Sequence, residues 1–235
     1  MNVLITGAAR GLGLCLVKCF ADRGHQVYAT VRNFKAAGQL IDFVKSMKEQ
    51  GKELQVHLME MDVTDWNSIV NCALQVEEEC ECMDVVINNA GVLYESDRMD
   101  KIMETQVEVL RGTIAVNVEG PILVLKAFYK LMLKSTYPKF YVITSEGTME
   151  GNWDGIPIYS LSKVAANKAV GIISVSVPDK FQVLAIHPGR MDTDMGHDTA
   201  QITPDAAADG IYDLAEEVIV PQSWYVNYLG DKMKV

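Results

Sequence analysis

Tyr159 and Lys163 stand four residues apart in the segment Y-S-L-S-K, a spacing that could support acid–base chemistry. On a helix, side chains four residues apart lie on the same face. A phenol with a pKa of about 10 exchanges protons poorly at neutral pH. An ammonium about 4 Å away favours the phenolate by roughly 4 kcal/mol at an effective dielectric of 20, or about three pKa units before desolvation costs. The pair is therefore a candidate general acid, with an exposed structural pair as the alternative.

A second candidate site is the segment T-G-A-A-R-G-L-G, which contains Gly7, Gly11 and Gly13. Residues 3–5 have the pattern of a buried strand and residues 12–20 that of a helix, so the glycines lie in a strand-to-helix turn. Glycine permits a positive φ, and without a Cβ the backbone N–H groups can approach a phosphate at the helix N-terminus. The spacing differs from G-x-G-x-x-G, and an ordinary glycine-rich turn is the alternative.

The elements that must position these residues alternate along the chain. The predicted strands are Val3–Ile5, Gln26–Val31, Leu54–Met59, Asp84–Asn88, Phe140–Thr144, Gln182–Ile186 and Ser223–Val226. The predicted helices are Leu12–Phe20, Phe34–Gln50, one capped by Thr64 or Asp65 and ending near Glu81, Asp100–Lys134, Ile158–Val175 and one from Thr203-Pro204 to about Glu217. Seven strands interleaved with six helices predict an α/β fold, a parallel, doubly wound seven-stranded sheet with helices on both faces.

Polar and glycine-containing segments follow four of these strands, and in such a sheet ligands bind beyond the carboxyl ends of the strands. The segments are Asp62–Thr64, Asn88–Gly91, Thr144–Gly147 and His187–Gly189. Together with the glycine-rich turn they form five groups at one edge. This edge is the predicted cofactor and substrate site. The position of the Tyr159–Lys163 pair at the same edge favours a functional role for the pair.

Composition narrows the function classes. The chain has 235 residues and a net charge of −10, which argues against nucleic acid and anionic membranes as partners. No apolar run approaches the ~18 residues that span a bilayer. Because a strand is predicted from residue 3, we expect no signal peptide. The five cysteines are odd in number and lack C-x-x-C spacing, so we expect reduced thiols in a cytoplasmic protein with no metal site.

With these motifs, the chain resembles the short-chain dehydrogenase/reductase family over essentially its full length. Thr6–Gly13 is similar to the family's T-G-x-x-x-G-x-G turn and Asn88–Gly91 to its N-N-A-G. Tyr159–Lys163 is similar to its Y-x-x-x-K, and Pro188-Gly189 to its P-G. The resemblance implies a single Rossmann-type NAD(P)-binding domain, residues 1–235, with the substrate site built into it.

The resemblance also implies four catalytic roles. Tyr159 would be the general acid, and Lys163 would hold the nicotinamide ribose and lower the pKa of Tyr159. Ser145 would hydrogen-bond the substrate carbonyl, and Asn117 would hold a water in the proton relay.

The assignment of the substrate-binding hydroxyl leaves an alternative open. The separation between Ser145 and Tyr159 is fourteen residues, one longer than the family's pattern. Alignment on Gly147 would favour Thr144, whereas alignment of the strand Phe140–Ser145 needs no gap and favours Ser145.

The resemblance implies a nicotinamide dinucleotide cofactor, and two arginines favour NADP(H). The residues expected to contact it are Gly7, Arg10, Gly11, Leu12, Gly13, Arg32, Asp62, Val63, Asn89, Ala90, Gly91, Tyr159, Lys163, Pro188, Gly189 and Thr193. An NAD site usually has an acidic residue at the end of the second strand, but here Val31 stands there, followed by Arg32. Arg10 and Arg32 together favour a 2′-phosphate, although either could be an ordinary surface arginine.

The segment Trp224–Gly230 is similar to the closing strand of C-factor and sniffer-type carbonyl reductases. Asn152, Asp154 and Gly155, which precede Tyr159, also resemble residues of that subgroup. This resemblance implies an NADPH-dependent reductase of small aldehydes and ketones. Two alternatives remain: a 3-oxoacyl or alcohol dehydrogenase of the same family with a larger substrate, and a non-catalytic NADP-sensing protein.

Only thirteen residues, 190–202, separate the Pro-Gly turn from the next predicted helix. With Met191, Met195 and Trp153 nearby, they predict an open, mainly apolar pocket for small or flat carbonyls, although all three could be packing residues. The apolar residues of the helix containing Asn117 and of the Tyr159 helix could form a homodimer interface, or could pack on their own sheet.

Overall fold

The structure is a computed structural model that describes residues 1–52, 54–98, 101–146, 155–191 and 200–234. Its centre is a seven-stranded sheet with the order β3-β2-β1-β4-β5-β6-β7, in which every neighbouring pair is parallel. The strands are β1 (Asn2–Ile5), β2 (Gln26–Val31), β3 (Val56–Glu60), β4 (Val85–Asn88), β5 (Lys139–Ile143), β6 (Gln182–His187) and β7 (Tyr225–Asn227). The predicted fold class is confirmed.

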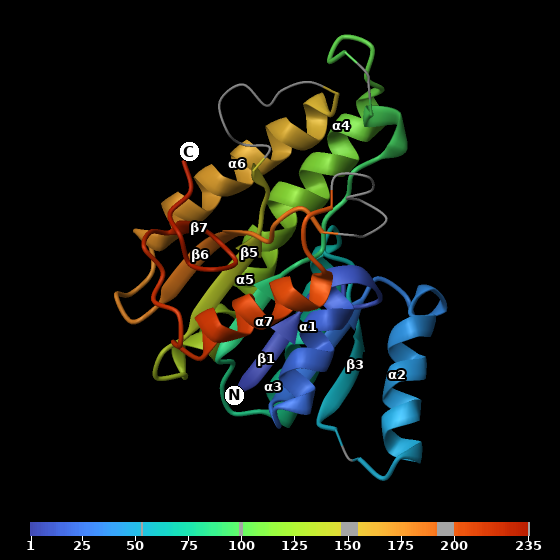
Figure 1. The fold of residues 1–235 in the computed structure, drawn as a ribbon, viewed down its shortest axis with the longest axis vertical. Coiled ribbons are helices and arrows are strands. Elements are labelled where there is room, and N and C mark those ends of the chain that lie inside the picture. Colours follow the sequence, from blue (N-terminus) through green and yellow to red (C-terminus); the bar gives the residue numbers. More distant parts are fainter. Residues whose placement is uncertain (53, 99–100, 147–154, 192–199, 235) are drawn as a thin grey trace.

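The helices form a layer on each face of the sheet. They are α1 (Gly11–Asp22), α2 (Gly38–Glu49), α3 (Trp66–Glu79), α4 (Val107–Ile114), α5 (Gly120–Leu133), α6 (Pro157–Ser174) and α7 (Pro204–Ala215). Helices α1 and α7 lie side by side over one face (Figure 1), and α3 and α5 pack together over the other. The strand order reverses between β1 and β4, which places the binding crevice of a doubly wound sheet at their carboxyl ends.

Alternate residues of β1 enter different hydrophobic clusters. Val3 and Ile5 pack with residues of α1 and α7, whereas Leu4 packs with residues of α3 and α5. Successive side chains of a strand point to opposite faces, so β1 is buried on both sides. An uninterrupted apolar run is therefore what this central position requires.

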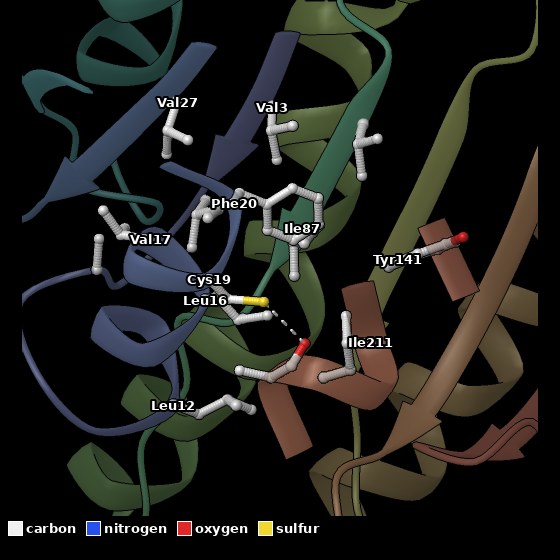
Figure 2. Packing of buried hydrophobic residues seen from close by; sticks show 14 of the residues in the cluster. Val3, Leu12, Leu16, Val17, Cys19, Phe20, Val27, Ile87, Tyr141 and Ile211 are labelled. Atoms are coloured by element: carbon white, nitrogen blue, oxygen red, sulfur yellow. Dashed lines mark hydrogen bonds between the residues drawn. The ribbon is translucent and has the colours of Figure 1, made fainter. Parts of the chain in front are cut away.

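Figure 2 shows how α1 joins the first of these clusters. Leu16 and Phe20 of α1 gather with Ile87 of β4 and Ile211 of α7. The Cys19 thiol donates to the main-chain oxygen of Ala208, 3.7 Å away, which links α1 to α7. All five cysteines are free thiols.

Three predicted elements differ from the observed ones. The helix predicted over 100–134 begins only at Val107, and a π-helical stretch (Ala115–Glu119) separates α4 from α5. The helix predicted from Phe34 starts with a 3-10 turn (Phe34–Ala36) before α2, and β3 begins at Val56. Of the two candidate caps of α3, Asp65 is the one that accepts from the N–H of Asn67, at 2.9 Å.

No helix in the described part of the chain has both the length and the apolar character needed to cross a membrane.

Candidate active site

The glycine-rich turn packs directly against the segment after β4. Gly7 has a φ of +66°, and a Cβ built on it would lie 2.8 Å from the Cα of Ala90. A Cβ on Gly13 would lie 2.2 Å from the main-chain oxygen of Gly7. Both separations are below any normal carbon contact, so these positions require glycine.

The N-terminus of α1 is open to a ligand. Gly11, its first residue, has a φ of +55°, and the preceding Arg10 makes no side-chain cap. The first turn carries no acidic residue. Uncapped N–H groups at the positive end of a helix dipole favour an anion, so this turn suits a phosphate.

Side chains from two strand ends hold the turn in place. The Asn89 amide donates to the main-chain oxygens of Thr6 (3.0 Å) and Gly7 (3.1 Å), and the Thr6 hydroxyl accepts from the N–H of Ala90 (2.9 Å). The N–H of Ala8 donates to the main-chain oxygen of Thr30 at the end of β2, 2.9 Å away. The turn, β2 and β4 therefore meet at one place, as the sequence predicts.

The two arginines expected to meet a 2′-phosphate flank this junction. Arg10 precedes α1 and Arg32 follows β2, and both side chains are exposed. Val31, the last residue of β2, is only 2% exposed and carries no acceptor.

The residues after β3 form hydrogen bonds within their own segment and pack against α5. One carboxylate oxygen of Asp62 accepts from the N–H and the hydroxyl of Thr64, at 2.9 and 2.7 Å. Val63 lies against α5, where a Cβ on Gly120 would be 3.2 Å from the Val63 side chain.

Tyr159 and Lys163 lie close together on α6, and both are buried. The Lys163 Nζ atom is 5.5 Å from the centre of the Tyr159 ring and donates to the main-chain oxygen of Ile143 at 2.8 Å. Burial raises the pKa of Tyr159 to about 12, opposed by a hydrogen bond with Ser145 that lowers it. Burial also lowers the pKa of Lys163 to about 8.

The expected lowering of the Tyr159 pKa by Lys163 is therefore wrong for this structure. Removing the phenolate from water disfavours the charged form, and this effect exceeds the stabilisation by neighbouring groups. Helical spacing predicts that two side chains are close, but it does not predict how dry their surroundings are.

Ser145 and Thr144 differ clearly in their surroundings. Ser145 hydrogen-bonds the hydroxyl of Tyr159, and its main-chain oxygen accepts from the Tyr225 hydroxyl at 2.9 Å. The Thr144 hydroxyl is buried and has no hydrogen-bond partner among the described residues. Of the two alternatives, it is Ser145 that the structure brings to Tyr159.

Asn117 lies in the π-helical stretch and connects three segments. Its amide oxygen accepts from the N–H of Val92 (2.9 Å), and its Nδ2 donates to the Val92 oxygen (3.0 Å) and the Ser162 hydroxyl (2.9 Å). A Cβ on Gly91 would lie 3.5 Å from Asn117 Oδ1 and 3.6 Å from Lys163 Nζ. Asn117 and Lys163 therefore approach Gly91 from two helices, and π-helical turns are common at functional sites.

A buried carboxylate that no sequence pattern indicates lies at the start of α6. Asp97 is 1% exposed, and its two oxygens accept from the N–H groups of Ile158 (3.1 Å) and Tyr159 (2.8 Å). Asp97 precedes these partners by 61 and 62 residues, so local capping patterns could not identify it.

Charged side chains at the ends of β5 and β6 form contacts that the sequence does not predict. Glu146 forms an ion pair with Arg190, and its N–H donates to His187 Nδ1 at 3.1 Å. The other ring nitrogen of His187 lies 3.8 Å from a Glu146 carboxylate oxygen, and burial lowers the pKa of His187. Charged and polar groups therefore lie directly beside Ser145.

The Pro188-Gly189 turn is held by close packing. Gly189 has a φ of +85°, and a Cβ on it would lie 2.5 Å from Ile202. Met191 forms a bridge with Ile202 and packs against the hydrophobic cluster that includes α1 and α7. The other residues named for this region, Gly147, Asn152, Trp153, Asp154, Thr193 and Met195, lie outside the described residues.

Comparison with known proteins is consistent with this geometry. Residues 1–203 match the family model for short chain dehydrogenase. An uncharacterised oxidoreductase of Schizosaccharomyces pombe is 35% identical over 199 residues, which cover 82% of this chain and 74% of that protein. The carbonyl reductase Sniffer of D. melanogaster superposes with a TM-score of 0.84 at 28% identity, with 97% of each chain covered. The NADPH-bound carbonyl reductase from chicken fatty liver has the same fold, with a TM-score of 0.83 at 24% identity over 99% of this chain and 93% of that one.

Proposed function

Since this chain belongs to the short-chain dehydrogenase family of oxidoreductases, we propose that it is an NADPH-dependent reductase of small aldehydes and ketones. The observation that carries the proposal is the hydrogen bond between Ser145 and the buried Tyr159 hydroxyl, with the Lys163 Nζ atom 5.5 Å from the Tyr159 ring. One domain spanning residues 1–235 would hold both cofactor and substrate.

The glycine-rich turn fits a dinucleotide, because its backbone is bare at Gly7 and Gly13 and the N-terminus of α1 is uncapped. Arg10 and Arg32, beside the apolar Val31, support NADP(H) over NAD(H). Both the resemblance to carbonyl reductases and the NADPH in the chicken enzyme agree with this choice. When bound, NADPH would supply the hydride that reduces the carbonyl carbon.

Tyr159 serves as the proton donor. A pKa of about 12 keeps its hydroxyl protonated at neutral pH, so the proton is available to an oxygen that gains negative charge. The Ser145 hydroxyl donates to the same carbonyl oxygen and polarises it. Lys163, whose Nζ atom lies near Gly91, would hold the ribose of the bound cofactor. Asn117 would order the proton relay by fixing Val92 and Ser162.

The test measures NADPH oxidation with purified protein across unrelated small carbonyls, including aromatic aldehydes and diketones. We expect turnover of several of them, with discrimination of about 1–3 kcal/mol per misfitting methylene. The variant Tyr159→Phe should lose a factor of about 10²–10⁴ in kcat while NADPH affinity changes little.

Three outcomes would count against the proposal. A preference above about 10⁴-fold for one bulky substrate would indicate the larger-substrate dehydrogenase, because a methylene in an apolar pocket is worth far less. NADPH binding without any turnover would indicate a sensor. More than half of the wild-type kcat in Tyr159→Phe would exclude Tyr159 as the proton donor.

We propose in addition that two copies associate through α4, α5 and α6. Apolar side chains are exposed on these helices, among them Val107, Leu110, Ile122 and Leu161. Sedimentation equilibrium tests this, and Leu161→Lys should shift the protein to the monomer.

A further inference from the structure

Asp97 is a buried acid to which the proposed chemistry gives no role. It ends a 3-10 turn (Glu95–Asp97) in the segment after β4, and its side chain is 1% exposed. One oxygen accepts from the N–H of Ile158 and the other from the N–H of Tyr159, at 3.1 and 2.8 Å. Both oxygens are therefore used by the main chain of α6.

The start of α6 needs an external cap. Its N-cap residue, Ile156, has no side chain that can accept a hydrogen bond, and Pro157 has no N–H to satisfy. The next two N–H groups belong to Ile158 and Tyr159, which are both buried. An N–H that is buried without a partner is strongly disfavoured, and a carboxylate at this end also complements the helix dipole. Asp97 satisfies both requirements from a distant part of the chain.

The main-chain carbonyl group of Tyr159 is hydrogen-bonded as well. The Ser162 hydroxyl donates to the main-chain oxygen of Tyr159 at 2.7 Å and accepts from Asn117 Nδ2 at 2.9 Å. The peptide groups on either side of the Tyr159 Cα are thus held by side chains from two segments. Because the direction of a side chain follows its backbone, these contacts determine where the Tyr159 hydroxyl lies relative to Ser145.

We propose that Asp97 is a positioning residue for Tyr159, an inference that rests on the proposed function for its catalytic consequence. Asp97 acts through the backbone of α6 and exchanges no proton with substrate. Its loss should lower kcat, because a displacement of about 1 Å at a reacting group can cost a factor of about 10². Affinity for NADPH should change little, because the glycine-rich turn lies on another segment and Lys163 keeps its bond to Ile143.

The experiment compares Asp97→Ala and Asp97→Asn with a matched control, Asp65→Ala. Asp65 also caps a helix with its carboxylate, but the helix is α3. With NADPH and a good carbonyl substrate, Asp97→Ala should lose a factor of about 10–100 in kcat, with the Kd for NADPH within about twofold. Asp97→Asn keeps the size and one acceptor oxygen, so its loss should be smaller. Asp65→Ala should keep kcat within about twofold, because its cap lies away from Tyr159.

A second readout does not depend on activity. The protein is labelled with 3-fluorotyrosine, and the Tyr159 resonance is assigned from Tyr159→Phe. That resonance should shift or broaden in both Asp97 variants and stay in place in Asp65→Ala. If the wild type reduces no carbonyl, the proposed function fails, and the fluorine spectrum still decides the role of Asp97.

The proposal is overturned if both Asp97 variants keep wild-type kcat and an unchanged Tyr159 resonance. It is equally overturned if Asp65→Ala lowers kcat as much as Asp97→Ala, since the effect would then be a general loss of stability. Asp97→Asn matches Asp97 in size. If Asp97→Ala does not fold, the kcat and the Tyr159 resonance of Asp97→Asn decide whether Asp97 positions Tyr159.

Discussion

The ammonium group of Lys163 donates to the main-chain oxygen of Ile143, at 2.8 Å, while the Tyr159 ring centre lies 5.5 Å away. Both residues are buried, so their pKa values move in opposite directions, to about 8 for Lys163 and about 12 for Tyr159. Lys163 is therefore the member of the pair that changes charge near neutral pH.

This relationship predicts a pH profile. The value of kcat/KM for NADPH reports ionisation in the free enzyme. It should be level below pH 8 and should fall about tenfold per pH unit above it, as Lys163 loses its proton and its charge. Tyr159 should not titrate in this range, because its pKa is about 12. In Lys163→Arg, which stays charged, the fall above pH 8 should disappear; a fall that persists in this variant would assign the titration to another group.

The contrast between Ser145 and Thr144 predicts that two conservative substitutions have different effects on kcat. Ser145→Ala removes the partner of the Tyr159 hydroxyl and should lower kcat by a factor of about 10²–10³, as the loss of a donor to a developing oxyanion does elsewhere. Thr144→Val removes a buried hydroxyl without a partner among the described residues, so stability should be equal or higher and kcat unchanged. Steady-state rates and thermal melting check both. The reverse pattern would make Thr144 the substrate-binding residue.

The two arginines predict the choice of cofactor. Arg32→Ala should raise the KM for NADPH by about tenfold or more, because a charge-assisted contact to phosphate is lost, and should leave the KM for NADH almost unchanged. Lys35→Ala, which removes another exposed cation nearby, is the control. Equal efficiency of the wild-type protein with NADH and NADPH would refute this choice.

His187 predicts how stability depends on pH. Burial lowers its folded pKa below the ordinary 6.5, although Glu146 opposes this shift and Arg190 adds to it. The unfolded chain therefore binds the proton more readily, and stability should fall as pH drops below 6.5, by at most about 1.4 kcal/mol per pH unit for one proton.

Urea unfolding at pH 7.5 and pH 5.5 measures this effect. His187→Asn should show a smaller loss of stability at the lower pH, while the contribution of His25, whose pKa burial also lowers, remains in both proteins. Identical pH dependence in the two proteins would contradict the assignment to His187.

The sequence was sufficient to predict the seven strands and their order along the chain. The bounds of β2 match those predicted, because a short apolar run between turn residues leaves few alternatives. The junction of Asn89 with the glycine-rich turn follows from two strands that end at the same edge.

The remaining features depend on tertiary contacts that no local pattern contains. The cap of α6 comes from Asp97, 61 residues before Ile158. The raised pKa of Tyr159 depends on burial by several segments, which spacing on a helix does not report. The ion pair of Glu146 with Arg190 joins two strand ends whose charges look like ordinary loop residues in the sequence.

The central place of β1 in the sheet has a consequence for biosynthesis. β1 pairs on one side with β2, which follows soon after it, but on the other side Val3 pairs with Val85 of β4. During translation β1 is made before β4, so the strand that leads into the glycine-rich turn keeps one unpaired edge until β4 has left the ribosome. Long-range parallel pairing is slow to form, and an exposed apolar edge invites association with other chains. The stage at which a chaperone has most to protect is thus the nascent segment between β1 and β4, before the two strands can pair.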